Sequence, residues 1–252
     1  MGVIALISDI HGNAEAFSAV LEDMERRSVE RIYCLGDVVG YGPDPELCID
    51  WARERCAATL LGNHDQALHD GPSGFNPLAA RAIQCVRSRM LRKDDSFAKN
   101  QDRLAWLQGL PLNRKERDIL MVHGTPFSNF EYVTPETLQL EPKRVARLLD
   151  HIDWVCFYGH THLPGVVTQD LRFVTADEAL GVYFLERGKK HMVNVGSVGQ
   201  PRDGNNQACY ATYDGEVVQF RRVPYEIDKT MEKIRAIDCL DNYLATRLVL
   251  GR

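Results

Sequence analysis

Short apolar runs alternate with amphipathic segments along the first third of the chain. Residues 3–8, 32–35 and 57–61 are continuously apolar and too short for surface helices, so they predict buried β-strands. The segment between the first two runs has apolar residues at helical spacing. These are Phe17, Val20, Leu21 and Met24. The alternation is typical of β-α-β units.

Two dipeptides mark the start of further helices. Asp44-Pro45 and Asn76-Pro77 each place a capping residue before a first-turn proline. The inward-facing residues that we expect are Leu47, Cys48 and Trp51 in the first helix and Ala82, Ile83, Val86 and Met90 in the second. Residues 92–100 are charged and predict a mobile connection.

The middle of the chain adds two strands that each lead to histidine. Residues 119–122 run into His123, residues 154–158 run towards His160, and Pro142 opens a helix between them. The last third is β-rich, which suggests a second sheet facing the first. Its expected strands are residues 181–185, 191–195, 209–213 and 217–223, with a hairpin turn at Asp214-Gly215.

A single domain accounts for residues 1–252. Residues 228–248 predict one C-terminal helix, because Met231, Ile234 and Ile237 recur at roughly helical spacing. We find no repeat, linker or low-complexity tract. The length and the 44% hydrophobic content are enough for one substantial core, which excludes a disordered or fibrous protein.

Charge and targeting signals narrow the partners. The formal net charge is −5, so no global positive field would attract nucleic acid or an anionic membrane. The first residues lack a basic region, and no apolar run reaches about 18 residues. We therefore expect no membrane partner and no stable nucleic-acid binding.

The cysteines point to a reducing compartment. Their number is odd and no C-x-x-C pair occurs, which argues against a disulfide framework or a zinc knuckle. They are Cys34, Cys48, Cys56, Cys85, Cys156, Cys209 and Cys239. We expect seven free thiols and a cytoplasmic protein.

Polar residues follow the ends of the predicted strands. They are Asp9, His11, Asp37, Asn63, His64, His123, His160 and His162. In an α/β sheet the carboxyl ends of the strands open onto one crevice, so these side chains should converge. This set contains five of the eight histidines; His69, His151 and His191 have no such context.

The mixture of ligand types indicates a metal centre. Carboxylate and amide oxygens combined with imidazoles suit Mn, Fe, Co, Ni or Zn better than Ca or Mg. Two ions about 3.5–4 Å apart need a shared ligand, and Asp37 is the natural bridging carboxylate. Taken singly, Asp9 or Asp37 would more often cap a helix, Asn63 would be a turn residue and His123 a core imidazole.

Five segments in order resemble a known family. They are Asp9-Ile10-His11, Gly36-Asp37-Val38-Val39-Gly40, Gly62-Asn63-His64-Asp65, Val122-His123-Gly124 and Gly159-His160-Thr161-His162. In order and spacing they resemble the five signatures of the calcineurin-like metallophosphoesterase superfamily. The likeness is strongest to its small bacterial and archaeal phosphodiesterase-like branch.

The resemblance implies a fold and a ligand set. The fold would be a four-layer α/β/β/α sandwich, with two mixed β-sheets flanked by helices. One metal would be held by Asp9, His11, Asp37 and His162, and the other by Asp37, Asn63, His123 and His160. A hydroxide between the two ions would attack phosphorus in line.

Two further residues take catalytic roles in this resemblance. His64 would face the substrate, where it could stabilise phosphoryl oxygens or protonate the leaving group. Asp65 would orient His64 through a carboxylate–imidazole hydrogen bond, although capping is an equal alternative.

The chain departs from the protein phosphatases and dinucleoside tetraphosphate hydrolases of the superfamily. Those proteins place an arginine shortly after the second signature and Glu after G-N-H, whereas this chain has Gly40-Tyr41-Gly42 and Asp65. Residues 194–202 also resemble the phosphodiesterase-like branch, and Arg202 is the candidate for the missing phosphate contact. Tyr41 is a second substrate-contact candidate. The alternatives are a solvated loop cation for Arg202 and packing for Tyr41.

The leading function is a dinuclear-metal phosphoesterase that hydrolyses a small phosphate ester, a phosphodiester or nucleotide. The alternatives are a protein Ser/Thr phosphatase, a nucleotide phosphomonoesterase and a non-catalytic scaffold. Substrate choice should lie in residues 71–75 and 127–134. The aromatic residues of the second loop could line the pocket or a homo-oligomer contact; they are Phe127, Phe130 and Tyr132.

Overall fold

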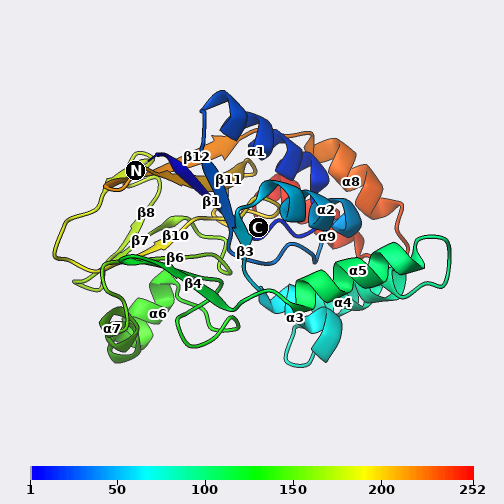
Figure 1. The fold of residues 1–252 in the computed structure, drawn as a ribbon, viewed down its shortest axis with the longest axis horizontal. Helices are drawn as coiled ribbons and strands as arrows, with labels where there is room; N and C mark the ends of the chain where they lie inside the picture. Colours follow the sequence, from blue (N-terminus) through cyan, green and yellow to red (C-terminus); the bar gives the residue numbers. More distant parts are fainter. Residues whose placement is uncertain (1) are drawn as a thin grey trace.

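Two six-stranded sheets pack face to face, and helices cover the outer face of each (Figure 1). The computed structural model describes residues 2–252. Helices α1, α2, α8 and α9 lie on the side of the first sheet, and α6 and α7 lie below the second. The expected four-layer α/β/β/α arrangement with two mixed sheets is confirmed.

The first sheet has the strand order β3-β2-β1-β11-β12-β9, and the second has the order β4-β5-β6-β10-β7-β8. The strands of the first sheet are β1 (Ile4–Ile7), β2 (Arg31–Cys34), β3 (Ala58–Thr59), β9 (Val182–Phe184), β11 (Ala208–Tyr213) and β12 (Val217–Val223). Those of the second sheet are β4 (Asn113–Glu116), β5 (Ile119–Val122), β6 (Val155–Tyr158), β7 (Gly165–Thr168), β8 (Phe173–Thr175) and β10 (His191–Asn194).

The helices follow the chain order of Figure 1. They are α1 (Ala14–Arg26), α2 (Pro45–Arg55), α3 (Asn63–Asp70), α4 (Pro77–Met90), α5 (Phe97–Gln108), α6 (Pro135–Leu140), α7 (Pro142–Asp150), α8 (Ile227–Arg235) and α9 (Asn242–Leu250).

The strands of the last third are divided between the two sheets, so the expectation that they build the second sheet was wrong. β11 pairs antiparallel with β1, and β12 and β9 extend that first sheet. Only β10 enters the second sheet, where it pairs in parallel with β6. The local apolar pattern reports that a strand is buried but carries no information about its pairing partner.

Alternation along β1 divides the core into two layers. Ala5 and Ile7 contact the helix side, where Phe17 of α1 is fully buried. Ile4 and Leu6 face the second sheet and pack with Phe157 of β6. Full burial of a side chain such as Phe17 stabilises the fold by about 1.5–3 kcal/mol.

The two proline pairs start helices as expected, but with different capping. Asn76 accepts a hydrogen bond from the backbone N–H of Ala79 at 3.0 Å. The Asp44 side chain makes no capping bond to α2 and instead accepts from Nζ of Lys233 at 2.7 Å. Leu47 was expected to face inward but is 39% exposed, because the buried stripe of α2 runs through Cys48 and Ile49.

The charged segment at residues 92–100 is partly helical, so the mobile connection that we expected is wrong for its second half. α5 begins at Phe97 and buries two polar side chains, Asn100 and Arg103. Arg103 donates to both carboxylate oxygens of Asp50 on α2, at 2.8 and 2.5 Å. The inward face of α5 is thus partly polar, which hides its helical period from a hydrophobicity pattern.

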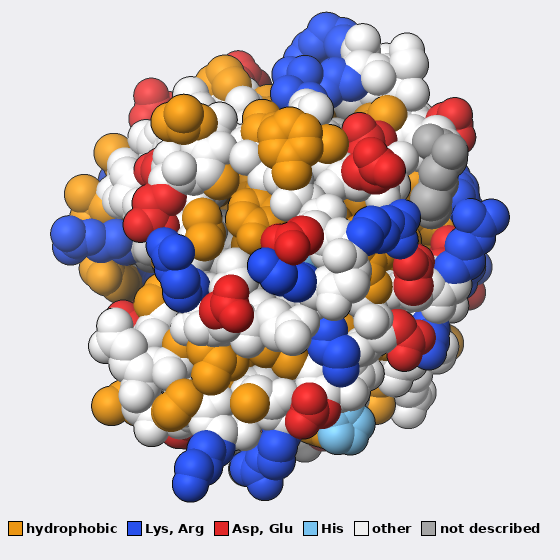
Figure 2. All heavy atoms as spheres, turned by 90° about the vertical axis from the view of Figure 1, so that its left-hand side faces the viewer, with side chains coloured by type: hydrophobic (Ala, Val, Ile, Leu, Met, Phe, Trp, Pro, Cys, Tyr) orange, Lys and Arg blue, Asp and Glu red, His pale blue; other side chains and the backbone are white. Residues whose placement is uncertain are grey.

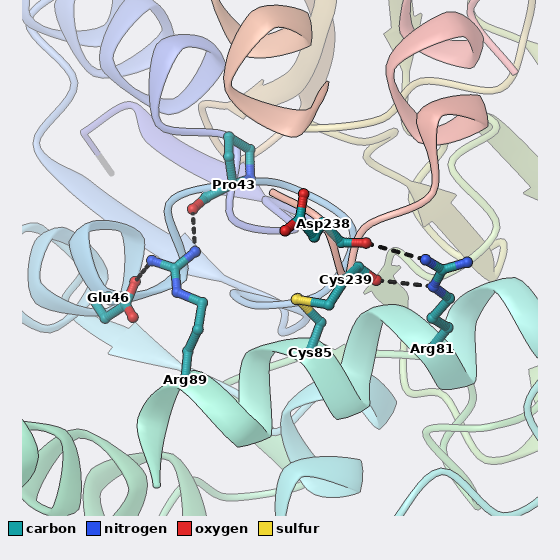
Figure 3. The surroundings of a disulfide bond; sticks show 7 residues. All are labelled: Pro43, Glu46, Arg81, Cys85, Arg89, Asp238 and Cys239. Carbon is teal, nitrogen blue, oxygen red and sulfur yellow. Dashed lines mark hydrogen bonds and ion pairs between the residues drawn. A yellow bond between two sulfur atoms is a disulfide. The ribbon is translucent and has the colours of Figure 1, made fainter. Parts of the chain in front are cut away.

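The C-terminal segment forms two helices rather than the single helix expected for residues 228–248. α8 ends at Arg235, and Asp241 caps α9 by accepting from the backbone N–H of Tyr243 at 2.9 Å. The turn between them carries Cys239, which forms a disulfide with Cys85 of α4 (Figure 3).

The expectation of seven free thiols is therefore wrong for Cys85 and Cys239. Their Cα atoms lie 5.5 Å apart although 154 positions separate them, a proximity that sequence spacing does not reveal. The other five cysteines of the described chain are free. Arg81 of α4 strengthens the same contact by donating to the carbonyl oxygens of Cys239 and Asp238 at 3.0 and 3.2 Å (Figure 3).

α4 also holds the loop that follows β2. Arg89 donates to the carbonyl oxygen of Pro43 at 2.7 Å and to the Glu46 carboxylate at 2.6 Å (Figure 3). The same loop inserts Tyr41 into an apolar cluster with Leu244 and Leu248 of α9. The C-terminal helices are thereby attached to a loop that carries candidate functional residues.

The surface mixes side chains of all kinds. On the face at the left of Figure 1, hydrophobic side chains are interspersed with basic and acidic ones (Figure 2). Near β9, Leu180 and Phe184 are largely exposed. Within residues 2–252, no helix is both long enough and apolar enough to cross a bilayer.

Candidate metal centre

The candidate ligands occupy the loops at the carboxyl ends of β1, β2, β5 and β6 and the first turn of α3. Five of them have a left-handed backbone, a conformation that few non-glycine residues adopt. They are Asp9 (φ 55°), His11 (φ 50°), Asp37 (φ 55°), His160 (φ 63°) and His162 (φ 62°). Such conformations persist where the surroundings fix them, and they cluster at functional sites.

One group of ligand atoms joins β1 to the loop after β6. Nε2 of His162 lies 3.1 Å from Oδ1 of Asp9 and 3.1 Å from Nε2 of His11. Oδ2 of Asp9 accepts the backbone N–H of His160 at 2.9 Å, which leaves Oδ1 directed at the two imidazoles. All three side chains are buried.

A second group lies beside the first. Nε2 of His123 is 3.0 Å from Oδ1 of Asn63 and 3.2 Å from Nδ1 of His160. Oδ2 of Asp37 lies 3.4 Å from Nε2 of His123 and 3.7 Å from Nε2 of His11. One carboxylate oxygen of Asp37 therefore faces both groups.

The hydrogen bonds of the imidazoles indicate which ring nitrogen of each histidine faces the centre. Nδ1 of His11 donates to the carbonyl oxygen of Val39 at 3.2 Å, and Nδ1 of His162 donates to that of Gln200 at 2.5 Å. A carbonyl oxygen can only accept, so the Nε2 atoms of the two rings present lone pairs to each other.

The second pair of histidines repeats this arrangement. Nδ1 of His123 donates to the carbonyl oxygen of Leu35 at 3.0 Å, and Nε2 of His160 donates to that of Phe130 at 3.3 Å. Four ring nitrogens, two carboxylates and an amide oxygen thus converge, and His123 would present its Nε2 lone pair to a cation after releasing its second proton. This donor set fits divalent cations bound by nitrogen and oxygen.

Burial, the two carboxylates and the neighbouring imidazoles all shift the pKa values of the centre. Burial alone would lower the pKa of His123, but Asp37 and Asp9 raise it to about 9. Burial and the neighbouring His123 lower the pKa of His160 to about 3. Although burial opposes ionisation, His123 and His64 hold the pKa of Asp37 well below its usual range. The ionised Asp37 therefore places a negative charge at the centre, which would attract a cation.

His64 lies at the edge of the centre. Its ring centroid is 4.7 Å from that of His11, and its Nδ1 is buried without a hydrogen-bond partner in the described chain. Burial lowers its pKa to about 4 despite the opposing effect of Asp37. Nδ1 is thus available to a bound ligand.

Asp65 does not make the expected contact with His64. Its two oxygens accept the backbone N–H groups of Val39 and Gly62, each at 3.1 Å. The carboxylate lies in the first turn of α3, and each of its oxygens is occupied by one of these two N–H groups. Asp65 therefore fixes the loop after β2 rather than the imidazole. Burial and Asp37 raise its pKa to about 7.

Gly40 is required by close packing at the centre. Its φ is 149°, and a Cβ atom at this position would lie 2.5 Å from Nδ1 of His11 and 2.9 Å from Nδ1 of His64. A Cβ on Gly62 would lie 2.1 Å from Oδ1 of Asp37. Neither position has space for a side chain.

Residues 194–202 support the ligand loops, a role that the sequence did not reveal. Asn194 donates to the carbonyl oxygen of Gly159 and to Oγ1 of Thr161, at 2.6 and 2.9 Å. Ser197 donates to the carbonyl oxygen of Asp9 at 2.8 Å. These buried side chains hold the loops after β1 and β6 together.

The two candidate specificity loops meet beside the metal centre. Phe75 packs against His64 with a centroid distance of 5.1 Å and against Phe130 at 5.9 Å. The Tyr132 ring lies 3.9 Å from that of His160. Phe127 instead packs on His151, at 4.5 Å. Phe130 and Tyr132, both partly exposed, thus border the centre, whereas Phe127 does not.

Tyr41 and Arg202 lie on another side of the centre. The Tyr41 ring is 4.7 Å from His11 and 4.7 Å from His64, and only 6% of the residue is exposed. Arg202 places its guanidinium carbon 5.9 Å from the centre of that ring. Its backbone N–H donates to the carbonyl oxygen of His162 at 3.3 Å.

Fold and site together define the class of protein: two facing sheets with buried histidine and aspartate side chains, as candidate ligands, on their connecting loops are the arrangement of metal-dependent phosphoesterases. A family model described as the calcineurin-like phosphoesterase superfamily domain matches residues 3–216. The chain belongs to this superfamily.

Relatives agree with this assignment. The chain is 36% identical to the uncharacterized protein MJ0912 of Methanocaldococcus jannaschii, over 99% of this chain and 98% of the relative. It is 28% identical to the phosphodiesterase YfcE of Escherichia coli, over 84% and 86% of the two chains. A metallophosphoesterase structure from Sphaerobacter thermophilus is 33% identical, with a TM-score of 0.79 and coverage of 100% and 99%.

Proposed function

We propose that the chain hydrolyses a small phosphodiester with the help of two divalent transition-metal ions. The observation that carries this proposal is the position of Asp37 Oδ2, which faces His11 of one ligand group and His123 of the other. A shared carboxylate is what a dinuclear centre needs.

The ligand groups divide between two ions. Asp9, His11, Asp37 and His162 would hold one, and Asp37, Asn63, His123 and His160 the other. Mixed imidazole and oxygen ligands favour Mn, Fe, Ni, Co or Zn. When bound, such a pair neutralises phosphate oxygens and lowers the pKa of a water molecule, which supplies the nucleophile.

The surrounding side chains have separate tasks. His64, with its unpartnered Nδ1, contacts a phosphoryl oxygen or protonates the leaving oxygen. Arg202 neutralises substrate charge. Asp65 is a positioning residue, and Tyr41 orients Arg202. The aromatic side chains of Phe130 and Tyr132 give a base or an aromatic ester group a surface to stack on.

Three alternatives compete with this proposal. A protein Ser/Thr phosphatase of the superfamily would need a cation after the second signature, where this chain buries Tyr41 with Leu244 and Leu248. A nucleotide phosphomonoesterase would cleave the monoester in the test below in preference to the diester. A scaffold would not require the complete acceptor set. The cytoplasmic location and a homo-oligomeric state stay predictions; the Cys85–Cys239 disulfide speaks against a strongly reducing compartment for the form described.

The test compares bis-p-nitrophenyl phosphate with p-nitrophenyl phosphate. Chelator-treated protein is reloaded with Mn, Ni, Co, Zn or Mg, and bound metal is measured on the same samples. Diester cleavage that a transition metal restores at about two ions per chain supports the proposal. Metal binding without cleavage of either ester favours a scaffold, and absence of metal binding refutes the dinuclear centre.

A further inference from the structure

Two arginines approach Tyr41 next to the metal centre. The guanidinium carbon of Arg202 lies 5.9 Å from the centre of the Tyr41 ring, and that of Arg247 of α9 lies 5.6 Å from it. Within residues 2–252, neither arginine has a carboxylate side chain within 4 Å. Arg202 donates to the neutral Oε1 of Gln200 at 3.0 Å, and Nε of Arg247 donates to a terminal oxygen of Arg252, the last residue of the chain, at 2.5 Å.

The donors on this side of Tyr41 are incompletely satisfied. Nε of Arg202 and Nε2 of Gln200 are buried and have no acceptor in the described chain. A buried donor without a partner is unfavourable, and more so when it is charged. Burial and the charge of Arg202 both lower the pKa of Arg247. An anion would satisfy these donors and offset the repulsion between the arginines.

This donor-rich region adjoins the acceptor-rich metal centre. The Tyr41 ring is 4.7 Å from His11, so the arginines lie about one aromatic ring away from a candidate metal ligand. This spacing is short enough for one small substrate molecule to reach both regions.

We infer that Arg202 and Arg247 form a subsite for a second phosphate group of the substrate, distinct from the phosphodiester that is cleaved. The inference rests on the proposed function and narrows its substrate class to phosphodiesters that carry an additional terminal phosphate, as some nucleotides do. Guanidinium groups suit this task because they bind phosphate oxygens through paired N–H donors.

α9 holds Arg247 in a fixed position. Leu244 and Leu248 of the same helix pack with Tyr41, and Cys239 in the preceding turn is bonded to Cys85 of α4. The family model ends at residue 216, so Arg247 lies outside the part of the chain that defines the superfamily. The subsite thus adds a specificity element to the common metal centre.

The experiment uses two esters with the same leaving group. Thymidine 5′-(p-nitrophenyl phosphate) is compared with its 3′-phosphorylated form on the metal-loaded full chain. We expect the wild type to prefer the 3′-phosphorylated ester in kcat/KM by at least about 10-fold. Arg247→Gln should bring this ratio close to one, and Arg247→Lys should retain part of it.

Arg235→Gln is the matched control, because it removes the same charge from an exposed position on α8. It should leave the ratio unchanged, and thermal melts should show that all variants are folded. A wild-type ratio near one, or a ratio that survives Arg247→Gln, would overturn the inference.

Binding separates this inference from the proposed function. Titration calorimetry with thymidine 3′,5′-bisphosphate and thymidine 5′-monophosphate requires no turnover. If Arg247→Gln weakens binding of the bisphosphate but not of the monophosphate, the subsite is supported even when neither ester is cleaved. Absence of cleavage would refute only the proposed phosphodiesterase activity. Equal weakening of both ligands, or of neither, counts against the subsite.

Discussion

The backbone N–H of His64 donates a hydrogen bond of 2.8 Å to Oδ1 of Asp37. The first turn of α3 thus fixes one oxygen of the carboxylate and leaves Oδ2 to face His11 and His123. One contact therefore positions both Asp37, which the two ligand groups share, and His64, which we propose contacts the substrate.

Asp37→Asn should remove the metals and the activity. An amide carries no negative charge and is a poor bridge between cations. Replacing a residue that only hydrogen-bonds to a metal ligand lowers metal affinity by up to about 100-fold, so loss of the bridging carboxylate should lower it by more than that. Metal content after dialysis measures the loss. Asp50→Asn, which alters a carboxylate between α2 and α5, is the control. Retention of two ions by Asp37→Asn would exclude a bridging role.

His64→Ala should retain both metals and lose about 10²–10⁴-fold in kcat, the usual contribution of a positioned acid or base. Rates with bis-p-nitrophenyl phosphate are measured together with metal content. His64 also lies close enough to His11 and Asp37 to share an ion with them. Loss of one ion from the variant would therefore identify His64 as a ligand, and wild-type rates would remove it from the mechanism.

Gly40→Ala should inactivate the protein, because the added Cβ would lie 2.5 Å from Nδ1 of His11 and displace this candidate metal ligand. Gly188→Ala provides the control for backbone strain: Gly188 has a positive φ of 86°, nothing lies within 4 Å of the added atom, and the position is outside both candidate specificity loops. It should cost about 1 kcal/mol of stability. Comparable activity losses in the two variants would show that strain, and not the contact with His11, is responsible.

Acid should weaken the attachment of α8 to α1. Lys233 and Thr230 donate to Glu15 at 2.6 and 3.1 Å, and they lower its pKa although burial alone would raise it. A carboxyl whose pKa is lower in the folded than in the unfolded chain stabilises the fold above about pH 4.3, its unfolded pKa. That contribution is lost as the pH falls through the folded pKa.

The matching variant is Glu15→Gln. In urea unfolding with chelator present, it should be less stable than the wild type by up to about 1 kcal/mol at pH 7. The difference should disappear at a pH below the folded pKa of Glu15. A difference that is constant from pH 7 to pH 3 would mean that packing, and not charge, accounts for it.

Reduction of the Cys85–Cys239 disulfide should destabilise the protein by about 2–4 kcal/mol. Thermal melts of the wild type with and without a phosphine reductant measure the change. The variant with both Cys85→Ser and Cys239→Ser should melt like the reduced wild type and ignore the reductant. Thiol titration in denaturant should count five thiols before reduction and seven after it.

The ligand loops were predictable because each candidate ligand lies close in sequence to the apolar run that marks a strand. Asp9 and His11 follow one apolar run and His160 and His162 follow another, and convergence of these ends is a property of α/β sheets. The resemblance to the superfamily added the order of the motifs and the sandwich of two sheets.

Long-range pairings were not predictable. The position of β11 beside β1, the Cys85–Cys239 bond and the approach of Arg247 to Tyr41 each join residues more than 150 positions apart. Nothing in the local spacing of these residues encodes such contacts, since they follow from the packing of whole elements. α5 was missed for a different reason: its buried face includes Asn100 and Arg103, which an apolar pattern does not register.

The disulfide also changes the connectivity of the molecule. It closes the chain from Cys85 to Cys239 into a covalent ring, which contains His123, His160 and His162. The segment before the ring, residues 1–84, contains Asp9, His11, Asp37 and Asn63. Each metal would thus connect this segment to the ring. A single proteolytic cut within the ring would release no fragment and would leave every candidate ligand on one connected molecule.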